Sequence, residues 1–244
     1  MRLSCLSAVT FFFSSSIHAQ TAVLEPGDAR VRTSGIRAAT DSFRIESNFG
    51  GQARKSTLIR SVTLARDNGR DVVVFAQYYR TPQGNTVDTS WVDAKTLAPV
   101  RYFADVYGEI QKFTFDGKTG TGTVTPKDSA SRPVSVTSGV PFFNSVALDL
   151  IYESLPWAPG FAVTVPVYNP PRASFSITLR VTGEESLPLA AGGTIDAWKL
   201  DYQLGPGTQQ LWLDKRTGEF LRIGGTQPAG SFYKYRTDLA PPKL

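Results

Sequence analysis

The sequence WVDAKTLAPVR at residues 91–101 returns as WLDKRTGEFLR at residues 212–222, at an offset of 121 residues. The two stretches share a tryptophan, an aspartate, a threonine and an arginine at matching positions. Each leads into an aromatic segment that ends in aspartate, GEIQKFTFD at residues 108–116 and GSFYKYRTD at residues 230–238. Repeats of about 20–50 residues are typical of solenoids and propellers, whereas two copies this far apart indicate one sheet built from two similar meanders.

Apolar residues recur mainly with a period of two. In FSITLRV at residues 175–181, every second side chain is apolar, which places one face of a strand on a core and the other in solvent. Turn sequences such as DNG at residues 67–69 separate such segments about every ten residues, the spacing of an all-β meander. Asp93 and Asp214 take the first position of two turns, where a carboxylate accepts local backbone N–H groups.

One segment departs from this alternation. NSVALDLIYESL at residues 144–155 has apolar residues at helical spacing, with Asn144 or Ser145 as a possible N-cap and Pro156 as a stop. The apolar face of this helix needs a partner, and a concave sheet is the natural one. We therefore predict an all-β (β-rich α+β) fold, in which a curved antiparallel meander sheet forms a half-barrel packed on this one short α-helix.

The N-terminus has the pattern of a secretory signal peptide. MRLSCLSAVTFFFSSSIHA at residues 1–19 combines a positive charge at Arg2, an apolar stretch around three phenylalanines and an acceptable cleavage site after Ala19. Cys5 precedes the apolar stretch, so we do not expect a lipoprotein signal. The predicted location is periplasmic or secreted.

The remaining chain divides by composition. Residues 20–52 are polar and rich in turn formers, which predicts an extended or partly disordered lead-in with one strand near residues 43–45. Residues 53–244 are expected to form a single β domain made of two similar meanders, at about residues 57–116 and 177–238.

Rare residues restrict the chemistry of the mature chain. Met1, Cys5 and His18 are the only residues of their types, and all three lie in the leader. Their removal excludes Ser-His-Asp and Cys-His catalysis, disulfides, and zinc sites that need imidazole or thiolate. We expect no enzyme activity, no metal and no cofactor.

Charge and hydropathy restrict the partners. The 26 Lys and Arg residues outnumber the 21 Asp and Glu residues, but they are spread along the chain without a basic run, so we expect no nucleic-acid partner. After the leader, no apolar run approaches the roughly 18 residues that span a bilayer, so we expect no transmembrane segment in the mature chain.

Three segments together resemble a known family. FNSVALDLIYESLPWAPGFAVTVPVYN, from Phe143, is followed by VTGEESLPLAAGGTIDAWKLDYQ and then by LWLDKRTGEFLRI. Their order is similar to that in bacterial exported proteins with a domain of unknown function. Those proteins resemble the curved-sheet half-barrels of periplasmic lipoprotein carriers and lipoprotein-binding proteins. The resemblance covers about residues 86–235 and implies a fold and a compartment, but no characterised activity.

The first functional hypothesis is a non-enzymatic periplasmic binding or accessory protein. Its concave sheet would hold an apolar ligand (a lipid or acyl chain) or the acylated terminus of a lipoprotein partner. A filled core would use the same aromatic residues as a ligand site. The aromatic residues expected to face the concavity are Phe75, Trp91, Phe113, Phe115, Trp198, Trp212 and Tyr235.

Two alternatives remain open. A cell-envelope assembly or structural protein would bind another envelope protein through a sheet edge or the polar lead-in. A carboxylate-only hydrolase would need two acidic side chains facing a groove. Asp149 and Glu153 share one face of the expected helix, which we interpret as two like charges in solvent rather than an acid–base pair. The other available carboxylates are Glu184, Glu185, Asp196 and Asp201.

Overall fold

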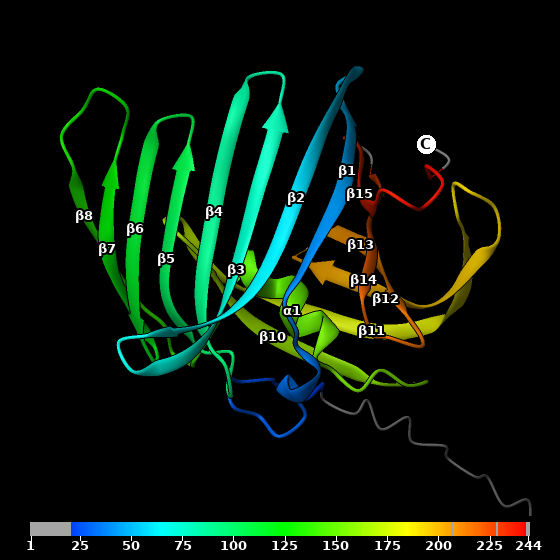
Figure 1. Ribbon diagram of the computed structural model, residues 1–244, viewed down its shortest axis with the longest axis horizontal. Coiled ribbons are helices and arrows are strands. Elements are labelled where there is room, and N and C mark those ends of the chain that lie inside the picture. Colours follow the sequence, from blue (N-terminus) through cyan, green and yellow to red (C-terminus); the bar gives the residue numbers. More distant parts are fainter. Residues whose placement is uncertain (1–20, 206, 228, 243–244) are drawn as a thin grey trace, which may run out of the picture.

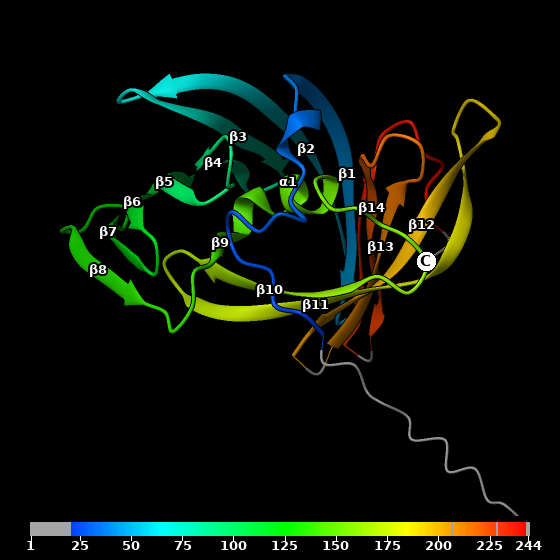
Figure 2. The same ribbon diagram turned by 90° about the horizontal axis from the view of Figure 1, so that it is seen from below.

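The computed structural model describes residues 21–205, 207–227 and 229–242, so the leader predicted at residues 1–19 lies outside them. The described residues form one 15-stranded sheet in the order β8-β7-β6-β5-β4-β3-β2-β1-β15-β14-β13-β12-β11-β10-β9 (Figure 1). The sheet is open and strongly curved, and it wraps around the single helix α1 (Figure 2). The predicted fold class is confirmed.

All neighbouring strands pair antiparallel except β9 and β10, which pair in parallel. The elements, in chain order, are η1 (Thr33–Gly35), β1 (Ala39–Phe49), β2 (Gln52–Asp67), β3 (Arg70–Thr81), β4 (Gly84–Asp93), β5 (Pro99–Val106), β6 (Glu109–Asp116), β7 (Thr119–Thr125), β8 (Arg132–Thr137), β9 (Phe143–Asn144), η2 (Ser145–Ala147), α1 (Leu148–Glu153), β10 (Ala162–Asn169), β11 (Ala173–Pro188), β12 (Thr194–Leu204), β13 (Gly207–Asp214), β14 (Phe220–Gln227) and β15 (Gly230–Arg236).

Two meanders meet at one seam. Strands β1 to β8 form the N-terminal meander and β10 to β15 the C-terminal one, with η2 and α1 in the connection. The first and last strands join them, because β1 pairs with β15 from Phe43 opposite Arg236 to Phe49 opposite Gly230. The chain therefore closes its two halves on each other at the middle of the sheet.

The polar lead-in contributes to this seam. The strand expected near residues 43–45 is β1, which pairs on both sides, and the boundary suggested at residue 53 falls inside β2. Leu24 and Val31, farther upstream, belong to the main core. The segment was predicted to be extended or partly disordered because only scattered side chains, such as the fully buried Phe43, face the core. Its strand β1 is held through its backbone by β2 and β15.

The repeated turns are built alike. The Asp93 carboxylate accepts the N–H groups of Lys95 and Thr96 at 3.0 Å. The Asp214 carboxylate accepts those of Arg216 and Thr217 at 2.7 and 3.0 Å. Both aspartates therefore serve the turn, as expected. Burial opposes the charge on Asp93, but the hydrogen bonds from Lys95 and Thr96 outweigh burial and lower its pKa.

The offset of 121 continues into the strands that follow, and this changes one alignment. Arg101 pairs with Thr114, whereas Arg222 pairs with Tyr235. Tyr235 is therefore the counterpart of Thr114, and not of Phe113 as the aromatic segments suggested. A register difference of one residue moves a side chain to the other face of a sheet.

The expected helix is present but short. Asn144 caps η2 by accepting the N–H of Val146 at 2.8 Å, and α-helical geometry starts only at Leu148. At the other end, the Ser154 hydroxyl and the Trp157 indole donate to the carbonyls of the last turn. Among the described residues, no helix is long and apolar enough to cross a membrane.

The core lies inside the curve of the sheet, around α1. Its buried side chains come from both meanders, the helix and the N-terminal segment. Where the two ends of the sheet approach each other, Phe113 and Phe115 of β6 pack on Phe142 and Tyr168, with ring centroids 5.9 to 6.3 Å apart. Aromatic packing, rather than backbone pairing, thus bridges β6 and β10.

Gly122 tests this aromatic contact. A Cβ atom at Gly122 would collide with the backbone oxygen of Lys112 and with the Phe113 ring. We expect Gly122→Ala to lower the free energy of unfolding by about 1–3 kcal/mol, because overpacking forces strands or rings to shift. Gly139→Ala is the control, since nothing lies within 4 Å of its added methyl group. Equal urea midpoints for the two variants would contradict the close packing at Gly122.

Candidate functional site

A cluster of buried charges lies where α1 meets the seam. Asp149 of α1 is 5% exposed and Arg60 of β2 is 4% exposed. The interpretation of Asp149 and Glu153 as solvent-facing charges is wrong. Because the sheet curves around the helix, the polar face of α1 also meets strands, and cationic side chains on those strands receive its carboxylates.

Arg60 holds three carboxylates at once. Its guanidinium donates to Asp41 at 2.6 Å, to Glu153 at 2.7 Å and to Asp149 at 3.3 Å. The Glu153 carboxylate also accepts the backbone N–H of Phe220 at 3.0 Å. Arg60 therefore ties β1, β2 and α1 together, and Glu153 extends the connection to β14.

Lys234 of β15 completes the cluster. Its ammonium group lies 2.8 Å from Asp149 and 4.3 Å from the centroid of the Phe220 ring. On the other side, the Phe43 ring lies under both the Arg60 guanidinium and the Lys234 ammonium, at 5.1 and 5.4 Å. Two cations thus face three carboxylates around two buried aromatic rings.

The cluster contains three carboxylates but two cations, and this excess of negative charge affects the pKa values of its members. Burial opposes the charge on Arg60, but Glu153, Asp149 and Asp41 outweigh burial and raise the pKa of the guanidinium. For Glu153, burial is the largest effect and raises the pKa of its carboxyl group, although Arg60 and the Phe220 N–H partly oppose the rise. Glu153 therefore takes up a proton more readily than an exposed glutamate does.

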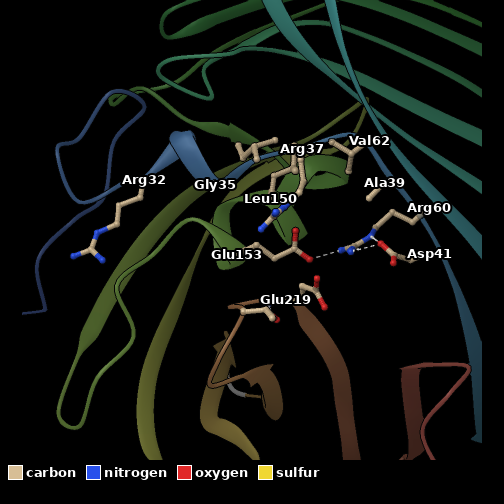
Figure 3. A pocket seen from close by; sticks show the side chains of 12 residues that line it. Arg32, Gly35, Arg37, Ala39, Asp41, Arg60, Val62, Leu150, Glu153 and Glu219 are labelled. Atoms are coloured by element: carbon tan, nitrogen blue, oxygen red, sulfur yellow. Dashed lines mark hydrogen bonds and ion pairs between the residues drawn. The ribbon is translucent and has the colours of Figure 1, made fainter. Parts of the chain in front are cut away.

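A small pocket of about 140 Å³ opens beside the cluster. Figure 3 shows the guanidinium of Arg60 between Asp41 and Glu153, with Glu219 near Glu153. The exposed Arg32 and Arg37 also line this pocket, so positive and negative groups are balanced around it. A pocket of this volume holds a few water molecules or a small group.

The raised pKa of Glu153 predicts that the stability of the protein depends on pH. Because its folded-state pKa is raised, its contribution to stability is greatest below the unfolded pKa and is lost as pH rises through the folded pKa. Glu153→Gln removes this titration but can still accept from Phe220. We expect the stability of Glu153→Gln relative to the native chain to increase as pH rises from about 4.5 towards neutrality. Urea unfolding at several pH values measures the difference, and the exposed Glu184→Gln is the control. Parallel pH profiles for native chain and Glu153→Gln would refute the raised pKa.

The seven predicted aromatic residues do not share one face. Phe75, Phe113, Phe115 and Trp198 lie on the inner face, which carries α1 and the core. Strand register places the other three on the outer face, because their cross-strand neighbours alternate with core residues. The outer three are Trp91, Trp212 and Tyr235.

Burial further separates the seven. Phe75, Phe113, Trp212 and Tyr235 are packed in protein, so their surface is occupied. Trp91, Phe115 and Trp198 keep some exposed surface. Of the predicted residues, therefore, only Phe115 and Trp198 combine an inner position with partial exposure.

The outer tryptophans have a structural use. The Arg101 guanidinium stacks 3.8 Å from the Trp91 ring centre, and the Arg222 guanidinium stacks 3.6 Å from that of Trp212. Trp212 and Tyr235 belong to a second core cluster, which the β11–β12 hairpin and Leu239 cover from outside. The repeated Trp and Arg positions thus form equivalent stacks, one buried and one partly open.

Arg60, Asp41 and Lys234 were not predicted from sequence. One signal was present for Arg60, because it stands between Leu58 and Val62 at an inward position of an alternating strand. A charge at such a position needs a buried partner. The sequence does not reveal that the partners come from a helix 89 residues away.

The remaining candidate carboxylates lie on β11 and β12 and are Glu184, Glu185, Asp196 and Asp201. Glu185 accepts the Trp212 indole N–H and pairs with Arg222, while Glu184 pairs with Lys215. Asp196 accepts the Ser186 hydroxyl. Within the described part of the chain, no group of three or more His, Cys, Asp or Glu residues is placed to hold a metal ion.

Comparison with known proteins defines the family. The family model for a protein of unknown function (DUF3108) matches residues 28–233, and the chain belongs to this family. A crystal structure of a DUF1329 family protein from Desulfovibrio piger is similar over 87% of this chain and 86% of that one, at 12% identity and a TM-score of 0.33. That level of similarity carries no argument about function. No curated protein matches the sequence.

Proposed function

We propose that this is an exported, non-enzymatic binding or accessory protein that holds an apolar ligand, a lipid or acyl chain, on the inner face of its curved sheet. The proposal rests on the partly exposed apolar side chains at the edge of the main core. Ile45, Tyr79, Phe175 and Ile223 pack against that core but remain partly exposed, and they come from both meanders.

The position of these side chains supports a ligand site beside α1. Ile45 and Ile223 flank Lys234 on the inner face, since both pair with it across neighbouring strands. Leu204 of β12 is 42% exposed on the same face, where it pairs with the core residue Ile177. Exposed apolar surface on a concave face is typical of ligand sites.

The arrangement of charge supports binding rather than catalysis. The two carboxylates of α1, Asp149 and Glu153, both form ion pairs with Arg60. A general base must reach substrate with a free lone pair in suitable geometry, and these groups are held by cations inside the core. The leader and the export that it implies remain part of the proposal.

Native mass spectrometry of the protein purified from its own cells tests the function. We expect a co-purifying lipid, and uptake of the apolar dye N-phenyl-1-naphthylamine that Phe175→Asp abolishes. Phe103→Asp is the control, because Phe103 is partly exposed on the outer face of β5, where it pairs with Thr89 and Lys112. Protein without lipid that also fails to take up the dye would refute the proposal. A stoichiometric protein partner without lipid would do so too, and would favour an envelope assembly role.

A further inference from the structure

The inner face of the N-terminal meander carries a row of polar side chains. Gln77 of β3, Asp88 of β4, Ala104 of β5 and Gln111 of β6 face one another in sequence across the strands. The methyl group of Ala104 is the smallest side chain in this row. Ala104 is 0% exposed and belongs to a small core cluster with Tyr102 and Phe113, so the polar groups on either side of it flank a buried apolar position.

Asp88 differs from the inner-face carboxylates around α1. Asp41, Asp149 and Glu153 each pair with Arg60, and Asp149 also pairs with Lys234. Asp88 forms no ion pair with any residue that the structure describes. Its carboxylate accepts one hydrogen bond, from the Tyr102 hydroxyl at 2.8 Å. Burial raises the pKa of the Asp88 carboxyl, and the hydrogen bond from Tyr102 opposes that rise only in part. A cation placed beside the carboxylate would favour its charged form.

Ser90 provides an independent observation. It lies two residues from Asp88 on the same inner face of β4 and is 0% exposed. Its hydroxyl has no hydrogen-bond partner among the described residues. A buried hydroxyl without a partner costs free energy, which a ligand group or a water molecule would recover.

The surrounding groups favour a cation over other polar groups. Glu109 lies one strand beyond Val106 and also forms no ion pair within the described residues, while it accepts the Gln111 amide at 2.8 Å. Burial raises the pKa of Tyr102, so its hydroxyl stays neutral at physiological pH. An anion would be repelled by two carboxylates, and a neutral hydroxyl would leave Asp88 uncompensated. An ammonium group has three N–H donors for such acceptors.

An apolar surface continues from this site. Tyr79 and Val106 lie in the next row of the inner face, both partly exposed, and they face each other across Thr86. Tyr79 also packs at the edge of the main core, where the proposed apolar ligand binds. A chain lying on that edge would bring a terminal head group within reach of the polar row.

We propose that Asp88, with the Ser90 hydroxyl oxygen and the Gln111 amide oxygen as further acceptors, binds the ammonium head of a cationic amphiphile whose apolar chain lies along Tyr79 and Val106. This inference rests on the proposed function, since it names the head group of the same ligand. It adds a requirement for positive charge that an apolar site alone would not impose.

Calorimetric titration of the full chain at neutral pH tests the inference with two probes of equal chain length, dodecylammonium chloride and dodecan-1-ol. We expect Asp88→Asn to weaken dodecylammonium binding at least about tenfold, because a desolvated charge pair is lost. The asparagine oxygen still accepts from Tyr102, so the fold is preserved. Dodecanol binding should be unchanged.

Asp116→Asn is the matched control, because it removes the same charge at an exposed position of β6. It should change neither affinity. Equal loss in both aspartate variants would indicate a long-range charge effect and overturn the site at Asp88. Unchanged dodecylammonium binding in Asp88→Asn would overturn the head-group site and leave the proposed function intact. Failure of the native chain to bind either probe would overturn both.

Discussion

Replacing Arg60 by methionine is expected to lower the free energy of unfolding by about 3–5 kcal/mol, since removing one partner of a buried ion pair leaves uncompensated charge. Here the loss exposes three carboxylates, Asp41, Asp149 and Glu153, to one another inside the core. Methionine fills similar space, so the effect is chiefly electrostatic. Urea unfolding followed by tryptophan fluorescence measures it.

Arg66→Met is the matched control for this variant. Arg66 lies on the same strand and pairs with Asp71 at 3.7 Å, but both side chains are more than two-thirds exposed. Exposed ion pairs contribute about 0–1 kcal/mol, so the control should shift the midpoint little. If the two arginine variants unfold at the same urea concentration, the cluster does not stabilise the fold as proposed.

Phe43→Ala is expected to cost about 3–5 kcal/mol, the usual range for a large buried aromatic residue. Phe43 is fully buried on β1 and packs edge-on against Phe220, with ring centroids 5.5 Å apart. Its ring also lies beneath Arg60 and Lys234. The substitution therefore removes packing and cation–π contacts from the seam between the two meanders.

The same experiment reports on the cooperation of the two halves. A single unfolding transition at lower urea would show that the seam couples the meanders, because both lose stability together. Two separate transitions would show that each meander folds by itself. Phe49→Ala, near the end of the same strand and 47% exposed, should cost less than about 1 kcal/mol. A comparable loss at Phe49 would contradict the central place of Phe43.

Arg60 and Phe43 lie where other side chains of the protein fill the inner face. The proposed ligand binds where apolar side chains of that face remain partly exposed. Around α1, ion pairs and aromatic rings fill much of the concavity, and a small pocket opens beside Arg60. Away from α1, Tyr79, Val106 and Phe175 remain partly exposed. A ligand would therefore lie beside the helix, and α1 need not leave its place.

The predicted half-barrel is confirmed because alternation and turns are local properties. Residues 175–181 alternate, and the structure places Ile177, Leu179 and Val181 in the main core. The failures concern faces rather than strands. Phe113 and Tyr235 occupy corresponding aromatic segments, yet the true register differs by one residue and sends them to opposite sides.

The candidate site was the least predictable part. Asp149 and Glu153 were recognised as a pair on one helix face, but their surroundings were taken to be water. Helical spacing specifies which side chains lie together, whereas burial depends on what packs against that side. In this chain the packing comes from β2 and β15, which are distant from α1 in sequence.

The sequence by itself determined the strands, the turns at Asp93 and Asp214, the short helix and the absence of imidazole and sulfur after residue 18, because each depends only on residue types and neighbouring positions. Tertiary structure alone decided that β1 joins the two meanders, that Arg60 and Lys234 meet the carboxylates of α1, and that Asp88 has no ion-pair partner among the described residues. Those outcomes depend on how far one continuous sheet curves. Curvature accumulates over many strands, and it determines which distant side chains share a dry interior and which remain in contact with water.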